Sequence, residues 1–370
     1  MERIETTGTF GGILGNGPAL RLLESALDRG EAAHAYLFYG PPGVGKRTVA
    51  YRFGAELVSA GDEGARDRAL RGLHPDLDEV EPEGQFTTIG QVREVVRGVA
   101  SRPFEGARRV FILRADTLNV QAANALLKTL EEPEGGAVFI LLASSREGVL
   151  PTVASRAQAM RFDPVPRSDI VSLLVERGHP EGEASLAAAL GRGSVGLALR
   201  YAEEDELKEL RETVFGAGFA FDGSFEDRHG AAERIFARAE SVGTGRERAY
   251  LEAYDTDADG GPNRRAKESA KRLGRAARDG AVVEALELLA LLYRDAGVVA
   301  TGAPELAVNA DRMAEIRARV AERPGADWAG AAAVFGEEGG KLTYNVSPEA
   351  ILEVALSRSR QKILESSRGS

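Results

Sequence analysis

The chain has 370 residues, of which 43% are hydrophobic and 28% are charged, and its net charge is -10. This length and composition indicate two or three folded domains with buried cores, and the acidic balance argues against a freestanding DNA-binding protein with a basic surface. The chain has no cysteine, no apolar run long enough to span a membrane and no visible secretory signal, so we expect a cytoplasmic protein without disulfides or thiolate metal sites.

The first predicted elements surround a glycine-rich loop. The stretch GPALRLLESALDRG (17–30) has apolar residues at helical spacing and ends in glycine, which predicts a helix. The stretch HAYLFYG (34–40) indicates a short buried strand, and KRTVAYRFGAELV (46–58) indicates a helix. Strand, glycine-rich turn and helix form the context in which phosphate-binding loops occur.

Helices and strands then alternate. Helical spacing returns in TTIGQVREVVRGVASRP (87–103) and NVQAANALLKTLEEP (119–133), while RRVFIL (108–113) and AVFILLAS (137–144) are β-branched and aromatic runs typical of buried parallel strands. This alternation predicts an α/β domain whose parallel sheet is covered by helices on both faces.

The pattern changes after RFDPVP (161–166). Prolines mark a boundary, short helices follow, and from about residue 203 no convincing strand is found. The stretch AVVEALELLALLYRDAGVVA (281–300) is apolar nearly all round, which predicts a buried helix in an all-helical region. The polar stretch DTDADGGPNRR (255–265) predicts a loop within it.

The glycine-rich loop fits the phosphate-binding pattern G-x-x-x-x-G-K-[ST] except at one position. Gly40, Gly45 and Lys46 match, but Arg47 replaces the hydroxyl residue that holds magnesium, and Thr48 comes one place late. A guanidinium cannot ligate a cation and repels one, so the loop keeps its anion-binding groups and loses its metal ligand.

Four motifs together resemble bacterial AAA+ clamp-loader subunits of DNA polymerase III. In chain order they are HAYLFYGPPGVGK, NALLKTLEEP, LPTVASRA and RFDPVP, and NALLKTLEEP is the most specific of them. The resemblance continues in LLALLYRDAGVVATGAPELAVNAD and YNVSPEAILEVAL and is weakest between residues 203 and 265.

The resemblance implies three domains and a set of partners. It implies an AAA+ P-loop α/β domain over 1–165, a small helical lid over 166–204 and a helical collar that drives oligomerisation over 205–370. The implied partners are the delta and gamma/tau subunits in a five-membered ring, which opens a sliding clamp and closes it around primed DNA, with no membrane partner. The implied role is a subunit of the polymerase holoenzyme.

The second predicted strand lacks the acids that active relatives carry. Counting back from Asn124, their Asp-Glu pair falls on Leu113 and Arg114, or on Arg114 and Ala115 in the alternative register. Either register loses both carboxylates. Asp116 is the only acid nearby, and we expect it past the end of the strand.

The sequence thus lacks two magnesium ligands and the water-polarising Glu, and in P-loop proteins these groups belong to one site. We expect no intrinsic ATPase and no metal site. Two interpretations of the loop stay open, an empty strand–helix turn and a weak site for ATP or ADP without magnesium-dependent hydrolysis. The candidate nucleotide-binding residues are Gly40, Pro41, Gly43, Val44, Gly45, Lys46, Arg47 and Thr48.

The resemblance assigns one catalytic residue, Arg156. In clamp loaders the tripeptide that matches Ser155-Arg156-Ala157 is Ser-Arg-Cys, and its arginine acts as an arginine finger in the ATP site of the next subunit. Such a guanidinium stabilises the charge of the transferring phosphoryl group. The alternative is an ordinary surface ion pair.

Other features of the family are absent or ambiguous. The chain lacks the cysteines of a zinc module, and we interpret His74 as a turn residue. Leu197 stands where a basic nucleotide sensor is often found, and a second sensor position falls on Ala143 or Ser144. Surface candidates for contact with DNA or a neighbour are Lys128, Glu131, Glu132, Arg102, Arg108 and Arg109.

The sequence therefore favours a non-hydrolysing, structural clamp-loader subunit that supplies an arginine finger to a neighbour. The alternatives are an ATP-hydrolysing gamma/tau-type motor subunit and a AAA+ ATPase of another kind. A motor subunit needs a Ser or Thr at position 47 and an Asp-Glu pair on the second strand, and this sequence has neither.

Overall fold

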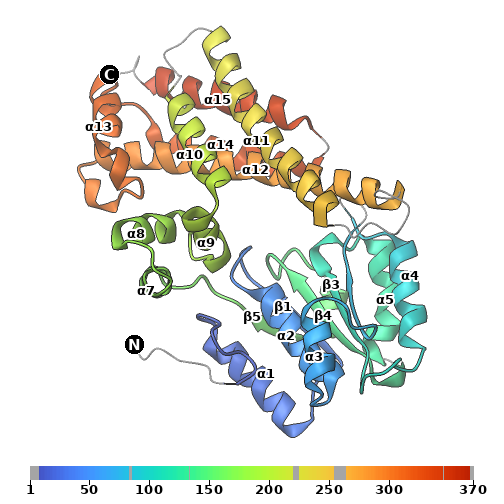
Figure 1. Ribbon diagram of the computed structural model, residues 1–370. Helices are drawn as coiled ribbons and strands as arrows, with labels where there is room; N and C mark the ends of the chain where they lie inside the picture. The colour runs from blue at the N-terminus through green and yellow to red at the C-terminus, as the bar shows by residue number, and fades with distance from the viewer. Residues whose placement is uncertain are drawn as a thin grey trace. The chain divides into compact units, whose positions relative to one another are not determined.

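The computed structural model describes residues 8–82, 86–132, 134–219, 225–253, 264–344 and 346–366. The chain divides into two compact units, Met1–Ala202 and Glu203–Ser370 (Figure 1). Residues 255–263 of the predicted loop lie outside the described residues. Within the described ranges, no helix is both long enough and apolar enough to cross a membrane.

The first unit is built on a five-stranded parallel sheet in the order β2-β3-β4-β1-β5 (Figure 1). In its register, Phe38 of β1 pairs with Leu142 of β4 and with Met160 of β5. The parallel-sheet α/β domain predicted from the sequence is thus confirmed. The strands are β1 (Ala35–Tyr39), β2 (Leu77–Val80), β3 (Val110–Arg114), β4 (Val138–Ala143) and β5 (Gln158–Arg161).

The two edge strands, β2 and β5, were not predicted. Each has four residues, and β5 buries only Met160 fully. Their polar side chains hide the apolar signal on which strand prediction depends, because an edge strand faces solvent along one side. The three central strands are buried nearly throughout, and their sequences predicted them correctly.

Helices cover both faces of this sheet. On one face, Tyr36 and Phe38 of β1 pack in a cluster with Phe53 of α2. On the other face, Leu37 of β1 packs in a cluster with Leu126 of α5. Neighbouring residues of one strand therefore serve opposite cores. The helices of this unit are α1 (Gly17–Arg29), α2 (Lys46–Ser59), α3 (Glu63–Leu70), α4 (Ile89–Val99), α5 (Val120–Glu131), α6 (Pro151–Ala154), α7 (Arg167–Glu176), α8 (Glu181–Leu190) and α9 (Val195–Glu203).

The second unit is helical throughout the residues that the structure describes. Its longest helices, α11 and α12, pack side by side (Figure 1). This confirms the predicted all-α character of the second part, while the three-domain division at 165 and 204 stays a prediction. The helices are α10 (Asp205–Gly218), α11 (Phe225–Ala253), α12 (Arg264–Ala300), α13 (Met313–Glu322), α14 (Trp328–Gly339) and α15 (Pro348–Ser366).

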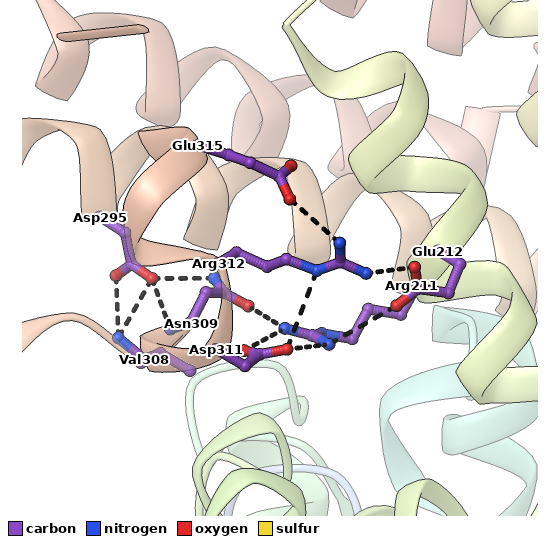
Figure 2. A network of polar contacts seen from close by, with 8 residues as sticks. All are labelled: Arg211, Glu212, Asp295, Val308, Asn309, Asp311, Arg312 and Glu315. Atoms are coloured by element: carbon purple, nitrogen blue, oxygen red, sulfur yellow. Dashed lines mark hydrogen bonds and ion pairs between the residues drawn. The ribbon is translucent and has the colours of Figure 1, made fainter. Parts of the chain in front are cut away.

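A polar network fixes the segment between α12 and α13 (Figure 2). The carboxylate of Asp295, fully buried on α12, accepts the backbone N–H of Val308 at 3.1 Å and that of Asn309 at 2.8 Å. It also accepts the Asn309 side-chain amide at 2.8 Å, and the amide oxygen of Asn309 accepts a hydrogen bond from Arg211 of α10 at 3.0 Å. Arg211 in turn holds both carboxylate oxygens of Asp311, at 2.8 and 2.9 Å. Three elements are thereby tied together by groups that satisfy one another.

We expect Asp295→Ala to lower the free energy of unfolding of the second unit by about 3 kcal/mol or more, because buried N–H groups lose a charged acceptor. Hydrogen exchange should report the loss as faster exchange of the amides of Val308 and Asn309. Asp279→Ala, on the same helix and in an ion pair with Arg278 that leaves the Asp279 side chain 45% exposed, is the matched control. It should cost about 0.5 kcal/mol or less. Equal exchange in the two variants would contradict the bracing role of Asp295.

Candidate functional site

The glycine-rich loop leads from β1 to the amino end of α2, where a helix presents unpaired backbone N–H groups. Gly40 and Gly43 have φ values of 147° and 76°, which residues with a Cβ rarely adopt. A Cβ on Gly40 would lie 2.0 Å from the carbonyl oxygen of Phe162, and one on Gly43 would lie 2.0 Å from Oγ of Ser194. Close approach therefore requires glycine at both positions, whatever the loop binds.

Lys46 is folded back over this loop. Its Nζ donates hydrogen bonds to the carbonyl oxygens of Gly40, at 2.5 Å, and Pro41, at 2.6 Å. Burial lowers the pKa of Lys46 to about 8; the Asp116 carboxylate opposes this shift and Arg114 adds to it. The lysine is thus a cation held at the loop by neutral partners, which an anion can displace.

Arg47 is bound at the end of β2. Its guanidinium forms an ion pair with Glu79, lies 3.3 Å from the carboxylate of Glu81 and stacks 5.6 Å from the ring centre of Tyr51. The hydrogen bond to Glu79 raises the pKa of Arg47 further above its ordinary value, so the group stays charged. Burial, together with a 2.5 Å hydrogen bond to Glu79, raises the pKa of Tyr51 to about 12. Position 47 thus carries a fixed positive charge where a magnesium ligand is needed.

At the end of β3, as at position 47, a basic residue stands where a group that supports magnesium was expected. Arg114 is the last residue of the strand, and Asp116 follows in a short 3-10 helix, past the strand end as predicted. The Asp116 carboxylate accepts the backbone N–H of Ser144 at 3.0 Å and its hydroxyl at 2.9 Å. It also lies 3.3 Å from the Arg114 guanidinium. Of the two candidate sensor positions, Ser144 is therefore the one that contacts the acid, while Ala143 is buried in β4.

These groups line one cavity of about 630 Å³ in the first unit. Its wall includes the loop, and segments distant in sequence complete it: residues 12–14 before α1, and Val195, Gly196 and Leu199 of α9. Ser194 joins the two parts, since its Oγ donates to the carbonyl of Gly43 at 3.0 Å and accepts the N–H of Leu197 at 3.0 Å. Leu197, at the expected sensor position, is not among the lining residues.

The charges in this cavity do not fit magnesium. Four lining residues are basic and only Asp116 is acidic, with its oxygens already bonded to Ser144 and Arg114. Magnesium needs oxygen ligands in near-octahedral geometry. In the part of the chain that the structure describes, no group of three His, Cys, Asp or Glu residues could hold a metal ion. The basic lining residues are Lys46, Arg47, Arg52 and Arg114.

Sequence reasoning missed part of this lining. The segment 12–14 gave no motif, and Arg52 was counted only as a helix residue. Arg52 donates to the carbonyl of Gly11 at 2.6 Å, so it fastens the segment before α1 to α2. Arg114 was noted for the carboxylate it replaces, but not for the charge it adds to the cavity. The available signal was an arginine nearly two turns into the helix after the loop.

Arg156 does not line this cavity. It follows α6, its side chain is 32% exposed, and its Nε and Nη2 both bind one carboxylate oxygen of Glu131, with the Nε distance at 2.6 Å. Its Nη1 donates to the carbonyl of Thr152 at 2.9 Å and to Oγ of Ser155 at 3.3 Å. The guanidinium is therefore oriented by its own chain, at a surface where a neighbouring molecule can reach it.

The other predicted candidates differ in their surroundings. Arg109 is packed between the rings of Phe104 and Phe111, at 5.4 and 5.2 Å, and it donates to the carbonyl of Gly98. The guanidinium of Arg109 is thus engaged within the chain, and its contact with phosphate stays a prediction. Arg102 is exposed, and His74 is buried with its Nδ1 accepting the N–H of Asp76 at 3.1 Å.

Parts of the chain are similar to known proteins. Residues 15–166 match the sequence model of the family described as DNA polymerase III, delta subunit. Over 139 residues the chain is 41% identical to the DNA polymerase III subunit delta' of Pseudomonas aeruginosa, a match that covers 35% of this chain and 42% of that protein. Over 209 residues it is 32% identical to subunit delta' of Escherichia coli, covering 53% and 62%.

A second DNA polymerase III subunit, tau, is also similar. The chain is 30% identical over 207 residues to the DNA polymerase III subunit tau of Bacillus subtilis, covering 50% of this chain and 36% of that protein. In each of these matches the chain spans less than two thirds of its relative's length. The chain is therefore similar to subunits of both names, and the residues of the cavity have to distinguish between them.

We expect the amine of Lys46 to react with an amine-directed acylating reagent with a midpoint at about pH 8. Only the neutral amine is a nucleophile, so reactivity rises with pH through that value, and bound phosphate should move the midpoint upward by stabilising the charged form. Mass spectrometry of the labelled peptide measures it, with Lys46→Arg as the control that removes the signal. Reactivity that rises only near about 10.4, as for an unperturbed lysine, would contradict this placement of the side chain.

Proposed function

We propose that this chain, whose residues 15–166 match the family described as DNA polymerase III, delta subunit, serves as a structural, delta'-type subunit of a bacterial clamp loader and does not hydrolyse ATP. In this role it helps the complex to load a sliding clamp onto primed DNA. In this proposal Arg156 acts in a neighbour's ATP site, while the chain's own site lacks the groups that would hold magnesium.

One observation carries the proposal: Arg47 is bound to Glu79 where a magnesium-holding hydroxyl is needed. Arg114 at the end of β3 and the prior bonding of Asp116 point the same way. Phosphoryl transfer in P-loop proteins depends on a metal that bridges the phosphates and on an acid that orients the attacking water. This cavity offers fixed cations in place of both.

The motor-subunit alternative has less support. The similarity to subunit tau supports this alternative only in the general sense that both are clamp-loader subunits. It needs, however, a hydroxyl at position 47 and carboxylates at the end of β3, and this chain has Arg47 and Arg114 there. The cavity therefore favours the structural role.

The same cavity supports weak binding of ATP or ADP without magnesium. The backbone N–H groups at the start of α2 and the Lys46 amine can hold phosphate oxygens, and Arg114 adds a charge that a metal would otherwise supply. The segment 12–14 and the α9 residues give the cavity apolar walls for a nucleoside.

Arg156 supplies the arginine finger in this proposal. Its guanidinium lies at the surface of the first unit, outside its own cavity, and Glu131 holds it in one orientation. A finger supplied in trans stabilises the charge on the transferring phosphoryl group of a neighbour. The partners we propose are gamma/tau and delta subunits in a five-membered ring, together with the sliding clamp and primed DNA in the bacterial cytoplasm.

We expect ADP and ATP to bind the full chain as well in EDTA as in magnesium, with no turnover in either. Isothermal titration calorimetry measures the binding, and release of inorganic phosphate measures the turnover. Lys46→Ala should weaken binding roughly tenfold, since it removes a charged hydrogen-bond donor. Binding at least tenfold tighter in magnesium, or turnover that Lys46→Ala abolishes, would contradict the proposal.

We expect Arg156→Ala to slow ATP hydrolysis about 1,000-fold or more at the one site that this chain serves, the usual worth of an arginine finger. Single-turnover hydrolysis by the complex reconstituted with its gamma/tau and delta subunits resolves that site from the others. The matched control is Arg161→Ala, which removes an arginine of β5 whose side chain is 70% exposed in an ion pair with Asp163. Equal rates in the two variants would show that Arg156 is an ordinary surface arginine.

A further inference from the structure

The first turns of α12 are strongly basic. Residues 264–279 include seven lysines and arginines against two acidic residues, in a chain whose net charge is -10. This segment lies in the second unit, just after the region of weakest resemblance (203–265), and the function proposed above makes no use of it. Local reversal of the overall charge is the electrostatic signature of an anion-binding surface.

Three of these cations form a stripe along one side of the helix. Lys267, Lys271 and Arg275 are four residues apart, and all three are exposed. In the described part of the chain none of the three has an ion pair or a hydrogen bond. Arg278, one turn further on, differs because it is bound to Asp279 at 2.8 Å and stacks on the ring of Phe236. The stripe thus ends before Arg278, whose side chain is held by contacts within the chain.

The stripe costs the helix stability. Like charges four residues apart destabilise a helix by about 0.2–0.5 kcal/mol per pair. Cations in the first turns also oppose the helix dipole, at about 0.3–1 kcal/mol for each one near the terminus. Arg272, beside the stripe, has only a 3.5 Å contact with Oγ of Ser269, and no acid within the described ranges neutralises the three cations. The fold itself gives no reason for this arrangement.

The adjacent side of the same segment, about 100° around the helix from the stripe, is packed tightly. Ala266, Ala270 and Gly274 are buried. A Cβ on Gly274 would lie 2.9 Å from the carbonyl oxygen of Gly243 on α11, and one on Gly243 would lie 2.7 Å from that of Gly274. The two helices therefore approach as closely as their backbones allow, side by side as Figure 1 draws them. The stripe is presented on a rigid support.

We propose that Lys267, Lys271 and Arg275, with Arg272 beside them, bind the phosphate backbone of nucleic acid. Four helical residues rise about 6 Å, so the three charges form an evenly spaced row about 12 Å long. An evenly spaced row of flexible cations suits a polyanion with regularly repeated charge. A protein interface would instead need a central apolar or aromatic anchor and few lysines. Leu273 is the only large apolar side chain exposed in this segment, at 37%.

The stripe has no side chain suited to base-specific contacts. The stripe has no aromatic side chain for stacking and no Asn or Gln for base edges, so its contacts are electrostatic and indifferent to sequence. The proposal stands apart from the nucleotide cavity, because the residues belong to the other unit. A variant that loses binding of nucleic acid at the stripe can therefore still be tested for nucleotide binding in the cavity, and the reverse.

The test uses the full chain and a fluorescently labelled single-stranded oligothymidylate, with binding followed by anisotropy between about 50 and 200 mM salt. The variant combines Lys267→Gln, Lys271→Gln and Arg275→Gln. We expect binding roughly tenfold weaker or more at low salt, and a plot of log affinity against log salt flatter by about 2, as three phosphate contacts on a single strand predict. Removing like charges should leave the helix content by circular dichroism unchanged.

The matched control removes three exposed arginines elsewhere, by Arg21→Gln, Arg29→Gln and Arg317→Gln, and changes the net charge by the same amount. It should bind as the parent chain does. Equal weakening in both variants would assign the effect to net charge and overturn the proposal, and so would failure of the parent chain to bind the oligonucleotide. Stripe-dependent binding of polyglutamate, without binding of the oligonucleotide, would assign the surface to an acidic protein and overturn it as well.

Discussion

The ion pair between Arg47 and Glu79 joins the amino end of α2 to the end of β2, beside the glycine-rich loop. It keeps a positive charge at the position from which a P-loop hydroxyl would hold magnesium, and the cavity has no free carboxylate to attract the metal by another route. The loop's glycines remain necessary because Phe162 and Ser194 lie against them. A loop can therefore keep its shape for packing reasons after its metal chemistry has gone, and its sequence alone then overstates its activity.

The sequence predicted those parts of the fold whose residues are buried or conformationally constrained. β1, β3 and β4 are continuous apolar runs, and the glycine-rich turn between β1 and α2 has a distinctive pattern. β2 and β5 escaped prediction because an edge strand of four residues with polar side chains looks like a loop. The site followed the same rule. Lys46 and Arg47 belong to a motif, whereas the contact of Ser194 with Gly43 joins residues 151 positions apart and leaves no local pattern.

The two units use charged residues in different ways. In the first unit, two of the cations around the cavity are paired with acids across short distances, Arg47 with Glu79 and Arg114 with Asp116. In the second unit, Asp295 is fully buried with several donors, while Lys267, Lys271 and Arg275 of α12 face solvent without partners among the described residues. A charge that is satisfied within the chain contributes to stability, and one that is left unsatisfied in regular array is available to another molecule.

The bond between Arg156 and Glu131 has a consequence for how the chain would serve a neighbour. In the proposed role, the guanidinium exchanges one anion for another when it enters a partner's site, so the gain is the difference between the two bonds. An empty site offers no anion to compete with a carboxylate that is already in place. The spread charge of a transferring phosphoryl group competes better. In the proposed role, Glu131 would therefore hold the arginine until a neighbour's nucleotide is ready to react.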